Sequence, residues 1–214
     1  MWLLILPLSL AAACAAHKPV HTALRQAAGK SDVLALYDAL ETLIAEGKDT
    51  PEDRQYAYDV VSRHDEDTAA AQFARAAVTG RLVQLHGLRM AGLVREVERC
   101  ARRSRELDPN FREGAATRLL GTLYIMAPAR LLQHGNSETG LDLLEGLTAA
   151  HPEVVQNHLR LAEAYIGLGD IEPARPHLCR CLVQKGVLRR DEQVLLGQLM
   201  VDAGPFDCPE VPEP

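Results

Sequence analysis

The feature of this sequence that most constrains its fold is a recurrence of small and apolar residues at a spacing of 34 residues. The positions that share this spacing form three pairs: Gly140 and Ala174, Leu144 and Leu178, and Leu147 and Cys181. A fixed period of this length is typical of arrays in which each repeat is a pair of helices. One such pair cannot bury its apolar face alone, so neighbouring pairs must stack on it. The spacing therefore predicts an all-α chain built from stacked antiparallel helix pairs.

Two further pairs of positions match in the same way but are 41 residues apart, seven more than the period of 34. They are Gly121 with Ala162 and Tyr124 with Tyr165. We call the whole set of matching positions the repeat frame. The first repeat therefore carries a seven-residue insertion. Small residues let paired helices approach closely, and tyrosine and leucine fill the groove between them. We expect the buried core of the repeats to consist of Gly121, Tyr124, Gly140, Leu144, Ala162, Tyr165, Ala174, Leu178 and Cys181.

The insertion lies within residues 125–136. Pro128 should end or kink the first helix of the repeat, and Gly135-Asn136 should stop its extension. Insertions in repeat proteins tend to gather on one face of the array, often the binding face. The candidate binding-face residues are Met126, Pro128, Leu131 and Leu132. We hypothesise that this segment borders a binding groove; the alternative is that the two leucines only pack on a neighbouring helix.

Helix start and stop signals are also present in the earlier part of the chain. A helix is expected over 31–46 and should end at Gly47. The next helix is expected to start at Thr50, because threonine can cap a helix and Pro51 suits its first position. Asp53 can complete a capping box with that threonine. These signals predict two helices joined by a short turn.

Further helices are expected over 66–86 and 89–107, and the segment 66–109 forms a weaker, earlier repeat. Asn110 and Glu113 are expected to cap another helix that runs to about residue 126. No window shows the sustained alternation that is typical of strands. Aromatic residues make up only 4% of the chain, and alanine, leucine, arginine and glutamate dominate it. This composition favours helices, which agrees with an all-α solenoid.

The run Leu161-Ala162-Glu163-Ala164-Tyr165, with Gly169 and the 34-residue spacing, resembles the tetratricopeptide repeat. More widely, residues 118–180 resemble the T component that accompanies TRAP-type transporters. The residues that carry this resemblance are Gly121, Tyr124, Ala127, Pro128, Gly140, the 161–165 run, Gly169 and Asp170. The resemblance implies a bacterial periplasmic lipoprotein with a helical solenoid and a pore or groove. It also implies a periplasmic solute-binding protein as partner and a hydrophobic small molecule as ligand.

The amino-terminal residues indicate export. Residues 1–13 are apolar apart from Ser9 and are too few to span a bilayer as a helix, which needs about 20 residues. The run ends in small residues, as a signal-peptide cleavage region does. The segment Leu10-Ala11-Ala12-Ala13-Cys14 resembles a bacterial lipobox, in which the cysteine is acylated. We expect lipidation of Cys14; a simple cleaved signal and an uncleaved anchor are the alternatives.

These observations predict four segments of the chain. They are a signal peptide over 1–13, a lipidated N-terminus and linker over 14–30, a helical domain over 31–203, and a Pro-rich acidic tail over 204–214. Acyl chains on Cys14 would hold the protein on a membrane surface. Ala15 follows this cysteine, whereas an Asp there would retain a lipoprotein at the inner membrane. The resemblance therefore implies the periplasmic side of the outer membrane.

Residues that could carry chemistry are sparse. The net charge is −6, and arginine alternates with glutamate over 95–106, which predicts a solvated helix face and no nucleic-acid partner. The sequence has no phosphate-binding loop, zinc-protease motif or serine-hydrolase motif. His17 and His21 have a spacing that could share a metal on a helix, but they lie in the expected linker. We therefore expect a non-enzymatic protein without a metal or cofactor.

Four cysteines follow the expected lipidation site: Cys100, Cys179, Cys181 and Cys208. An oxidising compartment permits disulfides. Cys179 and Cys181 are two residues apart on an expected helix and face roughly opposite ways, so they should not pair with each other. With Cys181 at a core position, Cys179 would be free to reach Cys208. Both this disulfide and free buried thiols remain open.

Two functions are compatible with these features. The first is a lipid-anchored periplasmic scaffold that binds a protein partner, such as the solute-binding subunit of a transporter. The alternative is a carrier that holds a small hydrophobic molecule in the groove or pore of the solenoid. A groove lined by charged residues would favour a protein or peptide partner, and a closed apolar tunnel would favour a small ligand.

Overall fold

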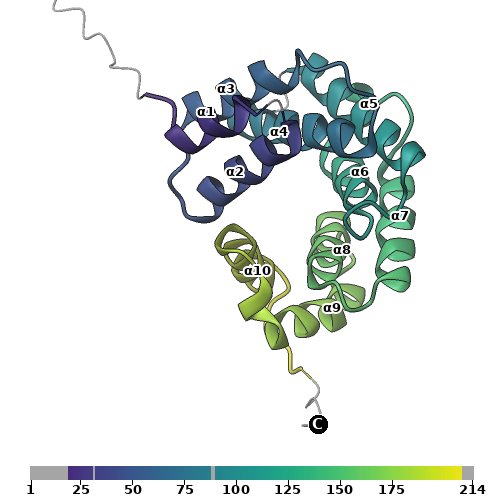
Figure 1. Ribbon diagram of the computed structural model, residues 1–214. Helices are drawn as coiled ribbons and strands as arrows, with labels where there is room; N and C mark the ends of the chain where they lie inside the picture. Colours follow the sequence, from purple (N-terminus) through teal and green to yellow (C-terminus); the bar gives the residue numbers. More distant parts are fainter. Residues whose placement is uncertain (1–18, 31, 88–89, 209–214) are drawn as a thin grey trace, which may run out of the picture.

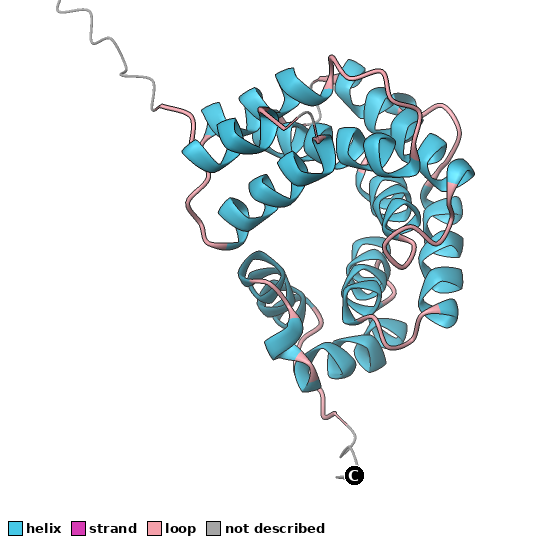
Figure 2. Ribbon diagram, in the orientation of Figure 1, coloured by secondary structure: helices cyan, strands magenta, loops and turns pink. Residues whose placement is uncertain are grey.

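The computed structural model describes residues 19–30, 32–87 and 90–208 (Figures 1 and 2). These residues form helices and loops, and no strand occurs among them, which confirms the all-α fold class. The α-helices are α1 (Thr22–Ala28), α2 (Val33–Ala45), α3 (Pro51–Val61), α4 (Ala69–His86), α5 (Ala91–Leu107), α6 (Ala115–Met126), α7 (Ser137–Ala150), α8 (Val155–Leu168), α9 (Ile171–Val183) and α10 (Arg190–Asp202). Two short 3₁₀ helices are η1 (Ala129–Leu131) and η2 (Lys185–Val187).

Local capping explains several of these boundaries. The Asp32 carboxylate accepts hydrogen bonds from the first backbone N–H groups of α2. Thr50 and Asp53 form the expected capping box of α3, with the Thr50 N–H donating to Asp53 Oδ2 at 3.0 Å. Gly87 ends α4 with a φ of 73°, a left-handed conformation that glycine adopts without steric cost. The helices expected over 31–46, 66–86 and 89–107 correspond to α2, α4 and α5.

The expected cap at Asn110 is wrong. The chain turns there, and α6 begins only at Ala115, after Arg112, Glu113 and Gly114 have adopted positive φ angles of 48°, 56° and 74°. The Arg112 guanidinium forms two hydrogen bonds of 2.7 Å with the Asp38 carboxylate on α2. A contact between residues far apart in the sequence therefore fixes a turn that the local capping pattern does not predict.

The segment expected as a linker contains α1. Leu24 is fully buried against α2, and the His21 N–H donates to Asp53 Oδ1 at 2.7 Å. The folded part of the chain thus extends well before residue 31. At the other end, Phe206 packs on the core formed by α8, α9 and α10, so the described start of the expected tail is attached to the fold. Residues 1–18 and 209–214 lie outside the described residues, and with them Cys14, His17 and the expected signal peptide.

The helices follow an arc in which α10 returns to contact α2 (Figure 1). The even-numbered helices form the inner layer, because α2, α4, α6, α8 and α10 each contact the next and α10 contacts α2. The odd-numbered helices cover them from outside, and the most extensive contacts join α4 to α5, α6 to α7 and α8 to α9. The inner layer therefore surrounds the centre of the molecule. None of the described helices is long and apolar enough to cross a membrane.

Close helix contacts occur at the small residues of the repeat frame. A Cβ placed on Gly121 would lie 2.6 Å from Leu144 Cγ, and one on Gly140 would lie 2.8 Å from the Gly121 carbonyl oxygen. The backbones of α6 and α7 can approach this closely only because neither residue has a side chain. At the matching positions of α8 and α9, Ala162 and Ala174 are fully buried.

The other residues of the expected repeat core are buried, with the exception of Tyr165, which is partly exposed. Leu144, Leu178 and Cys181 are fully buried, and Tyr124 is buried. Tyr165 is only partly buried, because its hydroxyl reaches the surface and donates to Glu145 at 2.5 Å. The equivalent tyrosine, Tyr124, instead lies under the loop that follows α6, against Gly135.

Candidate functional site

A cavity of about 850 Å³ lies at the centre of the molecule, between the inner helices. One part of its wall is apolar and comes from α4 and α6, through Ala77, Val83, Leu119, Leu123 and Met126. The cavity has the size of typical small-molecule sites, which are mostly apolar with a few placed polar groups. Met126 is 56% exposed, although it is a large apolar side chain, because it faces this space.

The remaining wall carries charged side chains. Five arginines and four glutamates line the cavity: Arg81, Arg112, Arg118, Arg160, Arg189, Glu41, Glu113, Glu163 and Glu192. The cavity is therefore neither a purely apolar tunnel nor a uniformly charged groove. It combines an apolar surface with ionised groups, which suits an amphipathic molecule.

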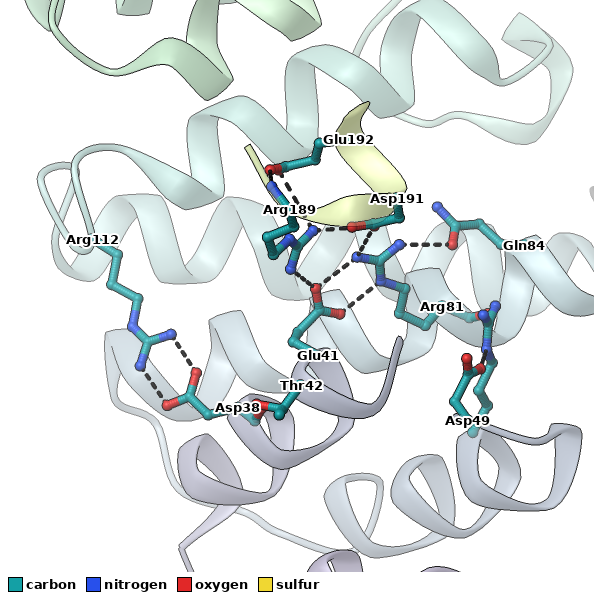
Figure 3. A network of polar contacts seen from close by, with 11 residues as sticks. Asp38, Glu41, Thr42, Asp49, Arg81, Gln84, Arg112, Arg189, Asp191 and Glu192 are labelled. Atoms are coloured by element: carbon teal, nitrogen blue, oxygen red, sulfur yellow. Dashed lines mark hydrogen bonds and ion pairs between the residues drawn. The ribbon is translucent and has the colours of Figure 1, made fainter. Parts of the chain in front are cut away.

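An ion-pair network joins the first and last inner helices (Figure 3). Glu41 of α2 accepts hydrogen bonds of 2.7 and 2.6 Å from Arg81 of α4. Arg189, directly before α10, also donates to Glu41. Asp191 lies 3.3 Å from both guanidinium groups. The network closes the arc by connecting α2 and α4 to the start of α10, and it forms one side of the cavity.

The charges of this network stabilise one another. Burial alone would raise the pKa of Glu41, but hydrogen bonds and charge from Arg81 and Arg189 outweigh this effect and lower the pKa. The pKa of Arg81 is raised, because its pairing with Glu41 outweighs the cost of burial. Both groups are therefore ionised at neutral pH. Removing one of them would leave a buried charge without its partner, which is strongly destabilising.

Arg118 is the exception among the arginines of the cavity wall. Its Nη1 donates to the Asn157 side-chain oxygen at 2.7 Å, and Asn157 is fully buried between α6 and α8. Within the described residues, no carboxylate oxygen lies within 4.0 Å of its guanidinium, whereas the other four arginines each have such a partner. Burial lowers the pKa of Arg118, an effect that the more distant Glu192 opposes.

The insertion after α6 contributes to the cavity only at its start. Met126 and Ala127 line the cavity, and Pro128 lies next to them as the residue before η1. Leu131 and Leu132 instead pack on an apolar cluster formed largely by α4 and α5. Asn136 does not extend the first helix; its side chain caps α7 by accepting from the Thr139 N–H.

A buried carboxylate that sequence reasoning missed holds the insertion in place. Glu98 of α5 is 1% exposed and accepts hydrogen bonds of 2.8 Å from the N–H groups of Gln133 and His134. Burial and the Glu98 charge raise the pKa of Tyr124 to about 12. The sequence shows Glu98 only as one member of the mixed arginine–glutamate stretch over 95–106, all of which lies on the outer helix α5. A glutamate at a core-facing position of that helix is the signal that could have identified it.

The cysteines fall into two groups. Cys179 and Cys208 form a disulfide with a Cα–Cα distance of 5.5 Å, which joins α9 to the segment after α10. Cys100 and Cys181 are buried free thiols. Burial raises the pKa of the Cys181 thiol to about 12, so this thiol stays protonated and unreactive at neutral pH.

Two histidines pack together between α8 and α9. His158 Nδ1 lies 2.8 Å from His177 Nδ1, and His158 Nε2 lies 2.9 Å from the Pro152 carbonyl oxygen. Because a carbonyl only accepts, the neutral His158 carries its proton on Nε2 and accepts from His177 through Nδ1. No group of metal-binding side chains was found among the described residues.

Comparison with known proteins found no matching family model and no curated protein with a significantly similar sequence.

Proposed function

We propose that this protein is a non-catalytic binding protein that holds a small amphipathic molecule in its central cavity. The observation that carries the proposal is the 850 Å³ cavity, which is lined by apolar residues of α4 and α6 and by charged residues from all the inner helices. A folded chain rarely keeps an apolar surface of this kind open at its centre without an occupant. The carrier function is thus preferred over the scaffold function, because the apolar part of the wall suits a small ligand.

The architecture that we propose for this site is a solenoid similar to tetratricopeptide repeats. In support, each inner helix pairs with an outer neighbour, and inner helices contact one another in order. The repeat frame places small residues where paired helices meet, at Gly121 and Gly140 and at Ala162 and Ala174. In such arrays the concave face is the usual binding surface, and the cavity lies on that face. A role beside a TRAP-type transporter remains part of the proposal through the sequence resemblance alone.

We also propose that the protein is a lipoprotein of the periplasm. The apolar run before Cys14 supports export, and the Cys179–Cys208 disulfide suits an oxidising compartment. Intact-mass analysis of the membrane fraction should find an acylated chain that begins at Cys14. The Cys14→Ala variant should be soluble or unprocessed, and a mature chain that lacks Cys14 would contradict the lipid anchor.

A cavity-filling substitution tests the carrier function. Gly80 lies on the cavity wall in α4, and a Cβ there would meet no heavy atom within 4 Å. Gly80→Trp should therefore fill the cavity without disturbing the helix, and should abolish binding of the neutral apolar fluorophore Nile red. Gly197→Trp is the matched control, because Gly197 is an exposed helical glycine of α10 with equally open surroundings. Equal Nile red binding by both folded variants and the parent would contradict a ligand cavity.

A second function, binding of a protein partner, is supported by the surface of α10. Val194 and Val201 are 57% and 79% exposed, and their spacing of seven residues places them on one face of the helix. Exposed apolar faces are typical of protein interaction sites. Crosslinking in intact cells should join this face to a defined partner, and Val201→Glu should abolish that crosslink. An unchanged crosslinking pattern in the variant would contradict a role for this face.

A further inference from the structure

Among the residues that the structure describes, Arg118 is the one arginine of the cavity wall without a carboxylate oxygen within 4.0 Å of its guanidinium. Arg118 points its guanidinium at Asn157 and makes no other hydrogen bond with the described residues. An arginine has five N–H donors, so most of its donors are left to whatever occupies the cavity. Side chains of this kind are costly to bury, because the charged form loses its hydration. A bound anion would repay this cost.

The buried Asn157 side chain fixes the position of the Arg118 guanidinium. Asn157 is fully buried and donates through its Nδ2 to the His151 carbonyl oxygen at 3.4 Å, which leaves its side-chain oxygen aimed at Arg118. The guanidinium is thus held on the cavity wall by a neutral group and not by a carboxylate. Its direction is set, but no described carboxylate forms an ion pair with it.

Arg160 and Glu192, two of the charged groups that act on Arg118, already have other partners. Arg160 pairs with Glu163 at 2.7 Å, and Glu192 lies 3.5 Å from Arg189 and accepts its backbone N–H. Neither glutamate lies within ion-pair distance of Arg118. A ligand anion can therefore bind Arg118 without breaking an existing ion pair.

Apolar residues continue from Arg118 along the same helix. Leu119, Leu123 and Met126 line the cavity beyond it, and Val83 of α4 lines the cavity as well. We propose that the cavity binds an organic monocarboxylate with an extended apolar body, and that Arg118 binds the carboxylate. This inference rests on the proposed carrier function and names the chemical class of its ligand.

The charge of the wall favours one negative charge over two. A phosphate monoester carries close to two negative charges at pH 7. The cavity wall carries five arginines and four glutamates, a formal excess of one positive charge, which one negative charge on a ligand balances and two would exceed. A carboxylate matches the single uncompensated guanidinium in charge, and the planar fork of arginine matches it in shape.

The test compares two probes that differ only in their head group, dodecanoate and dodecanol. Each is titrated by calorimetry and by displacement of Nile red. The parent protein should bind dodecanoate about 10- to 100-fold more tightly than dodecanol, as expected for hydrogen bonds to a charged group. Arg118→Gln should remove this preference while Nile red and dodecanol still bind. Arg180→Gln is the control for net charge, because Arg180 is exposed on the outer helix α9.

The outcomes separate this inference from the proposed function. If Nile red binds in the cavity but the parent shows no preference for dodecanoate, or Arg118→Gln keeps the preference, the ligand class is wrong and the carrier function stands. If neither Nile red nor dodecanoate binds the folded parent, both proposals are wrong. Should Arg118→Gln lose helix content by circular dichroism, Arg118→Met replaces it, since its apolar chain preserves packing without charge.

Discussion

The helix pairs α6–α7 and α8–α9 share one repeat frame but are held together differently. Leu144 and Leu178 occupy equivalent positions, and both are fully buried. In α6–α7 the contact is made by two glycines, whereas in α8–α9 it is made by two alanines. Residues 127–136 connect the first pair, and only residues 169–170 connect the second.

This difference separates the positions that set the packing of a helix pair from the segment that reaches the cavity. The frame positions fix how closely the helices approach, and they do so in both pairs. The long connection after α6 is attached to Glu98 and lets the end of α6 reach the cavity through Met126. The second pair instead carries a disulfide from α9 to the segment after α10.

The largest effect should come from the shared leucines. Leu144→Ala and Leu178→Ala should each lower the free energy of unfolding by about 2–5 kcal/mol, because each removes a fully buried side chain and leaves a cavity. Urea denaturation measures both losses. A loss near zero at either position would show that the two pairs do not share a frame.

The disulfide should stabilise only the second pair. Cys208→Ser should lower the free energy of unfolding by about 2–4 kcal/mol, because the disulfide closes a loop with a sequence separation of 29 residues. Hydrogen exchange should locate the loss in α9 and α10. Reductant should weaken the parent by a similar amount and leave the variant unchanged; a further loss in the reduced variant would indicate that another cysteine is responsible.

At the helix contacts, adding a methyl group to Gly121 should destabilise the protein, and so should removing the methyl group of Ala162. Gly121→Ala should cost about 1–3 kcal/mol, because its Cβ would lie 2.6 Å from Leu144 Cγ and 3.0 Å from the Gly140 carbonyl oxygen. Ala162→Gly should cost about 1 kcal/mol through helix propensity and a lost contact. Thermal denaturation of both variants checks this, and a more stable Gly121→Ala protein would mean that the α6–α7 contact is looser than described.

A smaller effect should depend on pH and arise only in α8–α9. Burial and the neighbouring His158 lower the pKa of His177 in the folded protein. Because protonation is then easier in the unfolded chain, stability should fall as the pH drops below about 6.5, the ordinary pKa of histidine. His177→Gln should flatten this part of the stability profile between pH 7.5 and 5.5, each value being about one unit from that pKa. An unchanged slope would assign the effect to another group.

The burial of Leu144 and Leu178 could be predicted from the sequence, because buried positions of paired helices can recur at a fixed period. Gly121, Gly140, Leu144 and Leu178 needed no knowledge of the rest of the chain. The turn before α6 could not be predicted in this way, because it depends on the pairing of Arg112 with Asp38. Local signals favoured a cap at Asn110, and a tertiary ion pair overrides them.

The cavity could not be predicted from the sequence either, because it also depends on contacts between residues far apart in the chain. Its closure depends on Arg189 meeting Glu41, two residues that no local pattern relates. Arg118 is one arginine among many in the sequence, and only the placement of α6 beside α8 shows that it pairs with Asn157 and with no carboxylate of the described part of the chain. The insertion was identified from the spacing, but the roles of its residues were not, since Met126 lines the cavity and Leu131 packs elsewhere.

The most direct test of the central claim is to locate a bound molecule in crystals of the protein. Crystals grown with ω-bromododecanoate allow the bromine to be placed by anomalous scattering. The account predicts a bromine peak inside the cavity beside Leu123 and Met126, with the carboxylate at Arg118. A peak only on the outer surface, or no peak at a concentration that saturates binding in solution, would contradict it.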